Sequence, residues 1–327
     1  VREQRLRRLA EAEAAALGFN QAITWGFGSP SVADKLRLPA DDERRRVIRI
    51  ANPLGEEHSV MRTTLLGGLL DAAQHNTARD IDSVALFETG RVYLPQRAPA
   101  EGGVAAGAFP GRMGPPAFEP LRLGLLAVGE LVPGSWRGAG QPADFFALKG
   151  VVEALCERFA VEPAFAPGSE PFLHPGRAAR VEIAGSAVGW IGELHPLVAA
   201  EWDLENRSVA AAELDLAPLF AASPLGEGTY EDLATFPAVF QDLAVVVPDD
   251  VPAERVRETV LEGGGELLRS ARIFDLYRGE QLGEGRKSLA LRLEFRAPDR
   301  TLTDAEVAER REAIRAALGG IGGSLRE

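Results

Sequence analysis

A group of side chains able to contact a ligand recurs on four predicted β-strands in the last third of the chain. The strands are expected at residues 240–247, 267–277, 287–296 and close to residue 326. Side chains alternate between the two faces of a strand, which places on one face Ala244, Tyr277, Ser288, Arg292 and Arg326. Bases of single-stranded RNA stack on aromatic rings, while hydroxyl and guanidinium groups hold base edges or phosphates. The pattern is compatible with an RNA-binding face, although the residues alone favour a merely solvated sheet face.

The opposite face of these strands is apolar and is expected to pack against helices. It contains Leu243, Val245, Val247, Phe274, Leu276, Leu289, Leu291, Leu293, Phe295 and Leu325. Helices are predicted at residues 252–263, where Pro252 fits the first turn, and at 304–318, where Thr303 and Glu306 form a capping box. The order strand, helix, strand, strand, helix, strand predicts a ferredoxin-like βαββαβ domain over residues 236–327.

The charge of the whole chain limits how nucleic acid could bind. The chain has 36 Lys and Arg residues against 48 Asp and Glu residues, a formal net charge of −12. Sequence-independent binding draws its free energy from cations that meet phosphates, so this balance argues against general nucleic-acid binding and no DNA partner is expected. Residues 278–300 contain six basic and four acidic side chains. Any RNA contact is therefore expected to be local.

The first two thirds of the chain predict a separate domain. Helices are expected at residues 2–17, 63–76 and 146–159, and strands at 22–27, 45–51, 83–94, 121–128, 180–183, 187–194 and 208–214. Runs of strands set between helices indicate an antiparallel α+β layer. The pattern alone favours Glu88 and Arg91 on the solvent face of this layer. Prolines and glycines mark residues 95–120 as a long loop of unreadable function and residues 223–235 as a linker, so the first domain spans residues 1–222.

Histidine and cysteine give weaker signals of chemistry. The four histidines, at positions 58, 75, 174 and 195, show no short ligand spacing and no neighbouring cysteine, so no metal site is expected. Cys156 lies on an apolar helical stripe. We interpret it as a small buried hydrophobic residue, with a catalytic thiol as the alternative.

The composition favours a globular protein in the cytoplasm. No apolar run approaches the roughly 18 residues that a membrane-spanning helix needs, and no signal peptide is recognisable. The sequence therefore predicts no membrane partner. Because Val1 falls in what reads as the interior of a helix, the chain is expected to be a fragment of a longer protein.

Two strings in the first domain carry a resemblance to a known family. They are Asn-Pro-Leu-Gly-Glu-Glu-His-Ser-Val-Met-Arg-Thr-Thr-Leu-Leu-Gly-Gly-Leu-Leu-Asp-Ala, which begins at Asn52, and Leu-Phe-Glu-Thr-Gly-Arg-Val-Tyr, which begins at Leu86. Both resemble the C-terminal part of the β subunit of bacterial phenylalanyl-tRNA synthetase, in its module related to class II aminoacyl-tRNA synthetase catalytic domains. The resemblance implies a non-catalytic antiparallel sheet with flanking helices that scaffolds a heterotetramer, while the α subunit holds the catalytic site.

The last third resembles the ferredoxin-fold anticodon-binding domain that closes the same subunit. The matching strings begin at Phe236, Asp242, Phe274, Gly285 and Thr301. The resemblance implies that the residues contacting the anticodon of tRNA(Phe) are Ala244, Tyr277, Ser288 and Arg326. Gln241 replaces an arginine that is usual in this pattern. The helix at residues 2–17 and its following segment resemble the class II subunit interface, which implies an α-subunit contact at Leu6 and Leu9.

Catalysis is expected to lie outside this chain. A class II site needs an arginine and a glutamate on one strand to clamp ATP, and a glycine-rich strand-helix element with a second arginine. Here the matching strand reads Phe87-Glu88-Thr89-Gly90, and no convincing glycine-rich arginine element follows it. The resemblance thus implies part of an ATP-dependent ligase that attaches phenylalanine to tRNA(Phe), with no catalytic residue and no cofactor on this chain and with ATP and Mg used through the α subunit.

Two other functions remain open at this point. One is a self-contained ATP-using enzyme with a degenerate adenylation site. The other is a free-standing RNA-binding or regulatory protein derived from the same modules.

Overall fold

The computed structural model describes residues 2–95, 117–136, 138–225 and 236–326. The chain divides into two compact units, Val1–Gly228 and Thr229–Glu327. Most of the predicted loop at residues 95–120 and of the predicted linker at residues 223–235 lies outside the described residues. The domain boundaries at residues 222 and 235 therefore stay predictions.

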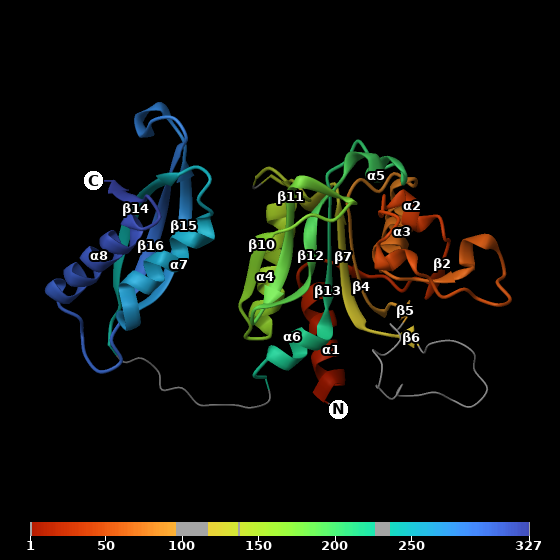
Figure 1. Ribbon diagram of the computed structural model, residues 1–327, viewed down its shortest axis with the longest axis horizontal. Helices are drawn as coiled ribbons and strands as arrows, with labels where there is room; N and C mark the ends of the chain where they lie inside the picture. Colours follow the sequence, from red (N-terminus) through yellow and green to blue (C-terminus); the bar gives the residue numbers. More distant parts are fainter. Residues whose placement is uncertain (1, 96–116, 137, 226–235, 327) are drawn as a thin grey trace. The chain divides into compact units, whose positions relative to one another are not determined.

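A seven-stranded sheet forms the centre of the first unit (Figure 1). Its order is β1 (Asn20–Gln21), β4 (Val84–Arg91), β7 (Leu121–Val128), β13 (Val209–Asp215), β12 (Ser186–Leu194), β11 (Leu173–Ile183) and β10 (Pro163–Pro167). The pair formed by β1 and β4 is parallel, and the other neighbours are antiparallel. The predicted antiparallel α+β layer is confirmed.

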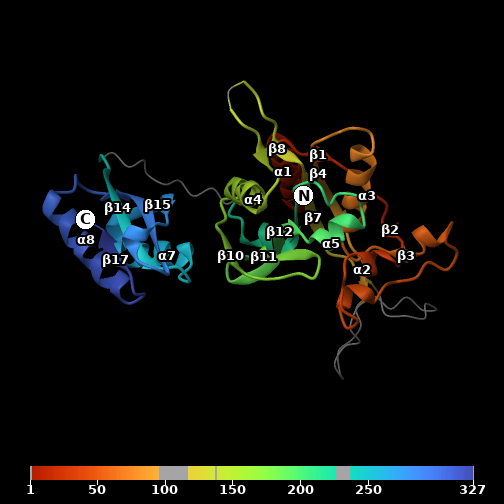
Figure 2. The ribbon, with the colours of Figure 1, turned by 90° about the horizontal axis from the view of Figure 1, so that it is seen from above.

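Helices cover both faces of this sheet. One face packs against α1 (Arg2–Ala16), α4 (Phe145–Arg158) and α6 (Leu216–Ala222), and the other packs against α2 (Val32–Lys35), α3 (Leu66–Thr77) and α5 (Pro196–Ala200). Figures 1 and 2 show α4 and α3 on opposite sides of β7. On β7, Leu123 and Leu125 enter the first core and Leu126 enters the second. The strand is apolar on both faces because each face has its own helical layer.

The segment between β1 and α3 contains less strand than the sequence predicts. It holds β2 (Phe27–Gly28), β3 (Val60–Met61) and two 3₁₀ turns, Glu43–Arg45 and Glu56–His58. The strand expected at residues 45–51 is wrong, since only Arg49 forms an isolated bridge there, to Val60. Asp42 caps the turn at Glu43–Arg45 by accepting a hydrogen bond from the Arg44 amide, so the backbone curls at the residue where the strand was expected to begin.

Short hairpins complete the first unit. They pair β5 (Leu94–Pro95) with β6 (Ala117–Phe118), and β8 (Glu130–Val132) with β9 (Gln141–Pro142). Throughout the ranges that the structure describes, no helix is long and apolar enough to cross a membrane.

The second unit has the predicted ferredoxin-like order of elements. Its antiparallel sheet runs β15 (Leu268–Tyr277), β16 (Arg286–Phe295), β14 (Val239–Pro248) and β17 (Ser324–Arg326). The helices α7 (Ala253–Gly264) and α8 (Asp304–Gly319) follow β14 and β16, with 3₁₀ turns at Gly265–Leu267 and Glu280–Leu282. This arrangement confirms the βαββαβ prediction.

One face of this sheet packs against α7 and α8, largely as alternation predicts. Leu243, Val245, Leu291 and Phe295 are buried there together with residues of both helices. Two residues of β15 that alternation placed in this core are exposed. Leu276 is 47% exposed although it pairs with the buried Leu289, and Phe274 leaves the core because a β-bulge interrupts the register between Ile273 and Asp275. The extra residue changes the alternation, and the ring of Phe274 is 54% exposed. The predictions of Phe274 and Leu276 in the core are therefore wrong.

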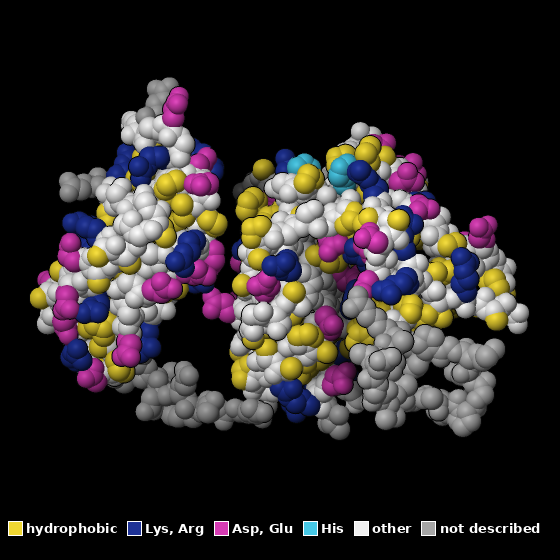
Figure 3. Space-filling model, viewed as in Figure 1, with side chains coloured by type: hydrophobic (Ala, Val, Ile, Leu, Met, Phe, Trp, Pro, Cys, Tyr) yellow, Lys and Arg dark blue, Asp and Glu magenta, His cyan; other side chains and the backbone are white. Residues whose placement is uncertain are grey.

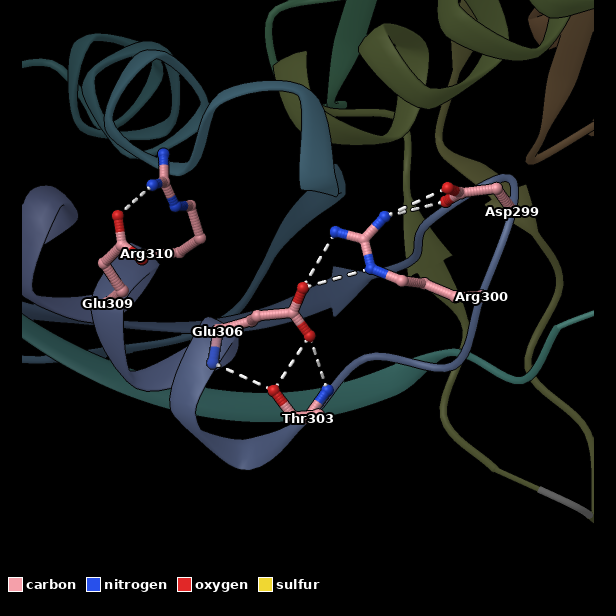
Figure 4. A network of polar contacts seen from close by, with 6 residues as sticks. All are labelled: Asp299, Arg300, Thr303, Glu306, Glu309 and Arg310. Atoms are coloured by element: carbon pink, nitrogen blue, oxygen red, sulfur yellow. Dashed lines mark hydrogen bonds and ion pairs between the residues drawn. The ribbon is translucent and has the colours of Figure 1, made fainter.

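The start of α8 is fixed by the predicted capping box (Figure 4). The Glu306 carboxylate accepts a hydrogen bond from the Thr303 amide at 2.8 Å, and Thr303 Oγ1 accepts one from the Glu306 amide at 3.4 Å. Arg300 donates a further hydrogen bond to Glu306 at 2.8 Å. The bond from the Thr303 amide, followed by that from Arg300, lowers the pKa of Glu306 to about 2.

Candidate nucleic-acid interface

The sheet face opposite α7 and α8, here called the open face, brings together the four residues predicted to contact RNA. Tyr277 on β15 pairs with Ser288 on β16. Ala244 on β14 pairs with both Ala290 on β16 and Arg326 on β17. Directly paired residues of neighbouring strands share a face, so these positions form two adjacent rows across the sheet.

The side chains of Arg326 and Tyr277 meet across these rows. The Arg326 guanidinium carbon lies 5.6 Å from the centre of the Tyr277 ring, within the range of a cation–π contact. Arg326 also donates a hydrogen bond to Gln281 Oε1 at 3.3 Å. Between the two strands that carry them, Ala244 and Ala290 offer only methyl groups. Their small size leaves room for the arginine to reach over the sheet toward the aromatic ring.

The accessibility of the four residues is unequal. Tyr277 is 40% exposed and Arg326 is exposed at the sheet edge, whereas Ala244 is half-buried and Ser288 is buried. The ring and the guanidinium group are therefore the parts of the set that a ligand can reach directly. Ala244 and Ser288 form the floor between them.

A second basic residue of the predicted face has a partner that the sequence analysis missed. Arg292 donates two hydrogen bonds to Asp242, each at 2.9 Å, and these bonds hold the pKa of Asp242 below its ordinary value. Register explains the pair, since Asp242 on β14 lies directly opposite Arg292 on β16. The sequence could have indicated this pair, because Asp242 and Ala244 are two residues apart and therefore point to the same face of the strand.

The open face carries both signs of charge. Arg272 pairs with Arg292, while Asp242, Asp275 and Glu294 occupy paired positions on the same strands. Acidic and basic side chains are also interspersed on the face of the second unit that Figure 3 shows. The field at the surface is thus weak, and recognition here would depend on stacking and on single guanidinium groups.

The two residues predicted at a subunit interface lie on α1 in the first unit. Leu6 is 4% exposed and belongs to the core between α1, α4 and the sheet, and Leu9 is partly buried against the same core. A charge placed at Leu6 would therefore disturb the unit itself. The residues after α1 offer a more accessible apolar surface, since Ile23 is 89% exposed and Trp25 is 69% exposed. Both line a cavity of about 690 Å³.

Glu88, predicted on the solvent face, is buried in the first unit. Its carboxylate accepts hydrogen bonds from Arg62 at 2.7 Å and from the Thr24 hydroxyl at 2.6 Å, and the side chain is 4% exposed. A Cβ atom at Gly90 would collide with the Arg62 guanidinium, so the glycine makes this pair possible. The prediction for Glu88 is wrong, because its partner comes from a distant loop. Arg91 is exposed as predicted.

A second buried carboxylate, Glu213 on β13, lies in the same unit. It forms an ion pair with Arg122 at 2.5 Å and accepts hydrogen bonds from the Thr64 hydroxyl at 2.6 Å and from the Leu65 amide at 2.8 Å. Thr64 Oγ1 in turn accepts a bond from the Leu66 amide, at the first turn of α3. Both oxygens of each buried carboxylate thus have donors from this chain, which fix loops to the sheet.

Three of the four histidines, and the cysteine, make contacts typical of structural residues. His195 accepts a hydrogen bond from the Leu197 amide at the start of α5, His174 accepts one from the Gly176 amide, and His58 packs against Phe27. Cys156 is buried on α4 as predicted, and burial raises the pKa of its thiol to about 12. Within the described ranges, no group of three or more His, Cys, Asp or Glu side chains could hold a metal ion.

Comparisons with known proteins agree with the two units. Residues 1–216 match the family model for the phenylalanyl tRNA synthetase beta chain CLM domain, and residues 234–326 match the ferredoxin-fold anticodon binding domain. The chain is similar to proteins named phenylalanine–tRNA ligase beta subunit from Symbiobacterium thermophilum (42% identity over 326 residues) and Moorella thermoacetica (43% over 329 residues). In both comparisons 99% of this chain is covered, but only 35% and 38% of the relative. The chain thus spans little more than a third of their length.

Proposed function

Because this chain belongs to the phenylalanyl-tRNA synthetase beta-chain family, we propose that it forms part of a cytoplasmic, ATP-dependent ligase that attaches phenylalanine to tRNA(Phe). In this proposal the second unit binds the anticodon through Ala244, Tyr277, Ser288 and Arg326. The observation that carries the proposal is the contact between Arg326 and Tyr277 on the open face, at 5.6 Å. An exposed aromatic ring beside a guanidinium group is the arrangement on which unpaired bases stack.

The proposal assigns a scaffolding role to the first unit. A mostly antiparallel sheet with one parallel edge pair and a helical layer on each face supports a class II synthetase-like fold for residues 1–222. The strand-helix element formed by β13 and α6 reads Val-Ala-Ala-Ala-Glu-Leu-Asp followed by Leu-Ala-Pro-Leu-Phe, without glycine or arginine. The side chains of Arg62 and Arg122 already bind Glu88 and Glu213. These two pairs and the composition of the element support catalysis on the α subunit, which would use ATP and Mg.

We place the α-subunit contact on α1 and the segment that follows it. Ile23 and Trp25 expose large apolar side chains next to a cavity, and exposed apolar groups of this size are typical of protein–protein contacts. Trp25→Asp should abolish co-purification with the α subunit, because it puts a charge into the contact without entering a core. Trp136→Asp is the matched control, since Trp136 is exposed elsewhere in the same unit. Equal recovery of the α subunit with both variants would contradict the placement.

Binding of tRNA tests the proposed function directly. The full chain should bind a tRNA(Phe) transcript and should bind the same transcript more weakly when its anticodon bases are replaced. Phenylalanine-dependent pyrophosphate exchange should be absent for the pure chain. Exchange above a mock preparation would instead favour a self-contained ATP-using enzyme, and equal affinity for both transcripts would remove the anticodon role. No feature of the described residues favours a free-standing regulatory protein over the ligase.

A further inference from the structure

The open face carries a second pair made of an aromatic ring and a guanidinium group. The Arg292 guanidinium carbon lies 5.6 Å from the centre of the Phe274 ring, the same separation as between Arg326 and Tyr277. The Phe274 side chain is 54% exposed. Arg292 belongs to the face identified from the sequence, whereas Phe274 does not, since alternation placed it in the core.

The bulge on β15 explains why a phenylalanine lies on this face. Ile273 pairs with Leu291, and the next paired residue is Asp275, opposite Ala290, so Phe274 is the additional residue between two regular pairs. A bulge redirects the side chain of the extra residue. Here the side chain of Phe274 reaches Arg292. The hydrogen bond between Arg292 and Asp242 places Arg292 on the open face, and Phe274 therefore lies on that face too.

Asp242 holds the guanidinium group of Arg292 in place. Two parallel hydrogen bonds of 2.9 Å connect the two side chains, and such a fork fixes the plane of a guanidinium group. The carboxylate also balances the charge of Arg292. A phosphate would be repelled by Asp242 at close range, whereas the uncharged ring of a base would not. The chemistry of the pair therefore favours a base.

We propose that Phe274 and Arg292 form a second base-stacking position, which binds a base close to the one that stacks on Tyr277. The inference rests on the proposed anticodon role of the open face and extends it to a second nucleotide of the same single strand. Phe274 and Tyr277 are three residues apart on β15, about 10 Å along a strand. A short stretch of extended single-stranded RNA can span that distance.

Abasic RNAs can separate the two positions. The full chain would be titrated with the anticodon stem-loop of tRNA(Phe) and with versions in which one loop nucleotide at a time lacks its base. Phe274→Ala should weaken binding of the intact stem-loop by about five- to tenfold, because stacking on one aromatic ring is lost. At one loop position, removal of the base should weaken binding by the wild-type protein but should cause no further loss of affinity in Phe274→Ala. A different position should show this coupling to Tyr277→Ala.

Three further variants complete the test. Phe274→Trp should retain binding because it keeps an aromatic ring, and Phe274→Ala should leave the salt dependence of binding unchanged because no phosphate contact is removed. Phe146→Ala is the matched control, since Phe146 is an exposed phenylalanine on α4 of the first unit. Thermal melts would verify that each variant is folded.

The outcomes distinguish this inference from the proposed function. Wild-type affinity of Phe274→Ala together with weak binding by Tyr277→Ala would overturn the second position and leave the anticodon role intact. Coupling of both variants to the same abasic position would also overturn it, because one base would then account for both rings. Wild-type affinity of both variants would overturn the anticodon role itself.

Discussion

The two units place their arginine side chains in different surroundings. In the first unit, Arg62 and Arg122 bind Glu88 and Glu213, two carboxylates that are almost completely buried. In the second unit, Arg292 and Arg326 lie on the open face beside exposed aromatic rings. A buried ion pair is satisfied by its own chain and holds the fold, whereas a guanidinium on an open sheet still has a side available to a ligand. The comparison thus agrees with a structural role for the first set and with the recognition role proposed for the second.

The largest expected effect follows from removing a buried ion pair of the first unit, and it is a loss of stability of that unit. Glu213→Ala leaves Arg122 and the amide of Leu65 without their buried acceptor, and loss of one partner of a buried ion pair typically costs roughly 3–5 kcal/mol. Asp242→Ala should leave unfolding unchanged, because its pair with Arg292 is exposed to water. Urea unfolding of Glu213→Ala should be followed by tryptophan fluorescence, since all four tryptophans belong to the first unit, and unfolding of Asp242→Ala by far-UV circular dichroism, since its unit contains no tryptophan. Similar stabilities of Glu213→Ala and wild type would contradict the structural role.

Tyr277→Ala tests the recognition half of the comparison. Loss of one stacked base is worth roughly 1–3 kcal/mol, so affinity for tRNA(Phe) should fall by about tenfold or somewhat more. The ring is 40% exposed, and thermal melts should therefore show an unchanged second unit. Equal tRNA affinity of the folded variant and wild type would remove Tyr277 from the site.

Arg326→Ala should lower tRNA affinity less than Tyr277→Ala does, and it should also change how the affinity depends on salt. If its guanidinium holds a phosphate, affinity falls similarly for cognate and anticodon-substituted tRNA, and the slope of log affinity against log salt concentration decreases by about one ion. Titrations at several salt concentrations measure that slope. A sequence-dependent loss with an unchanged slope would show that Arg326 reads a base.

The smallest expected effect concerns the start of α8, where an exposed charge has a purely local role. The pKa of Glu306 is about 2 in the folded chain and 4.5 ordinarily, so its ionised form stabilises the fold. This contribution is complete above about pH 4.5 and is lost as the pH falls toward 2. Thr303→Ala removes the N-cap, which should cost roughly 1 kcal/mol near neutral pH and raise the pKa of Glu306. The alanine keeps the backbone amide that bonds Glu306, so only the part of the shift due to the Thr303 hydroxyl is lost. Titration of the Glu306 carboxyl by NMR would show this rise, and an unchanged pKa would contradict a contribution from the hydroxyl.

The elements that sequence predicts well are those with local causes. The capping box at Thr303 and Glu306 spans four residues, and both its hydrogen bonds are present. Strict alternation likewise identified Leu243, Val245 and Leu291 as core residues and brought Tyr277 and Arg326 to one face. Each of these inferences needs only the period of a helix or a strand.

The sequence analysis failed where a distant residue or one additional residue decides the outcome. Glu88 reads as a solvent-facing strand residue until Arg62, 26 positions away, is known to reach it. Glu213, about which the sequence analysis made no prediction, pairs with Arg122, 91 positions away. For Phe274, one bulge residue reversed the parity on which the prediction depended. The pairs that distinguish the two units are thus tertiary features, and neither period nor spacing encodes them.

The buried thiol of Cys156 makes this chain convenient for spectroscopy. Cys156 is the only cysteine in the sequence, it is buried on α4, and its pKa of about 12 leaves almost no thiolate at neutral pH. Maleimide reagents require an accessible thiolate. A cysteine introduced at an exposed position such as Arg272 would therefore react selectively in the native protein, with the natural residue left in place. A fluorophore attached there would lie on the open face and could follow ligand binding in real time.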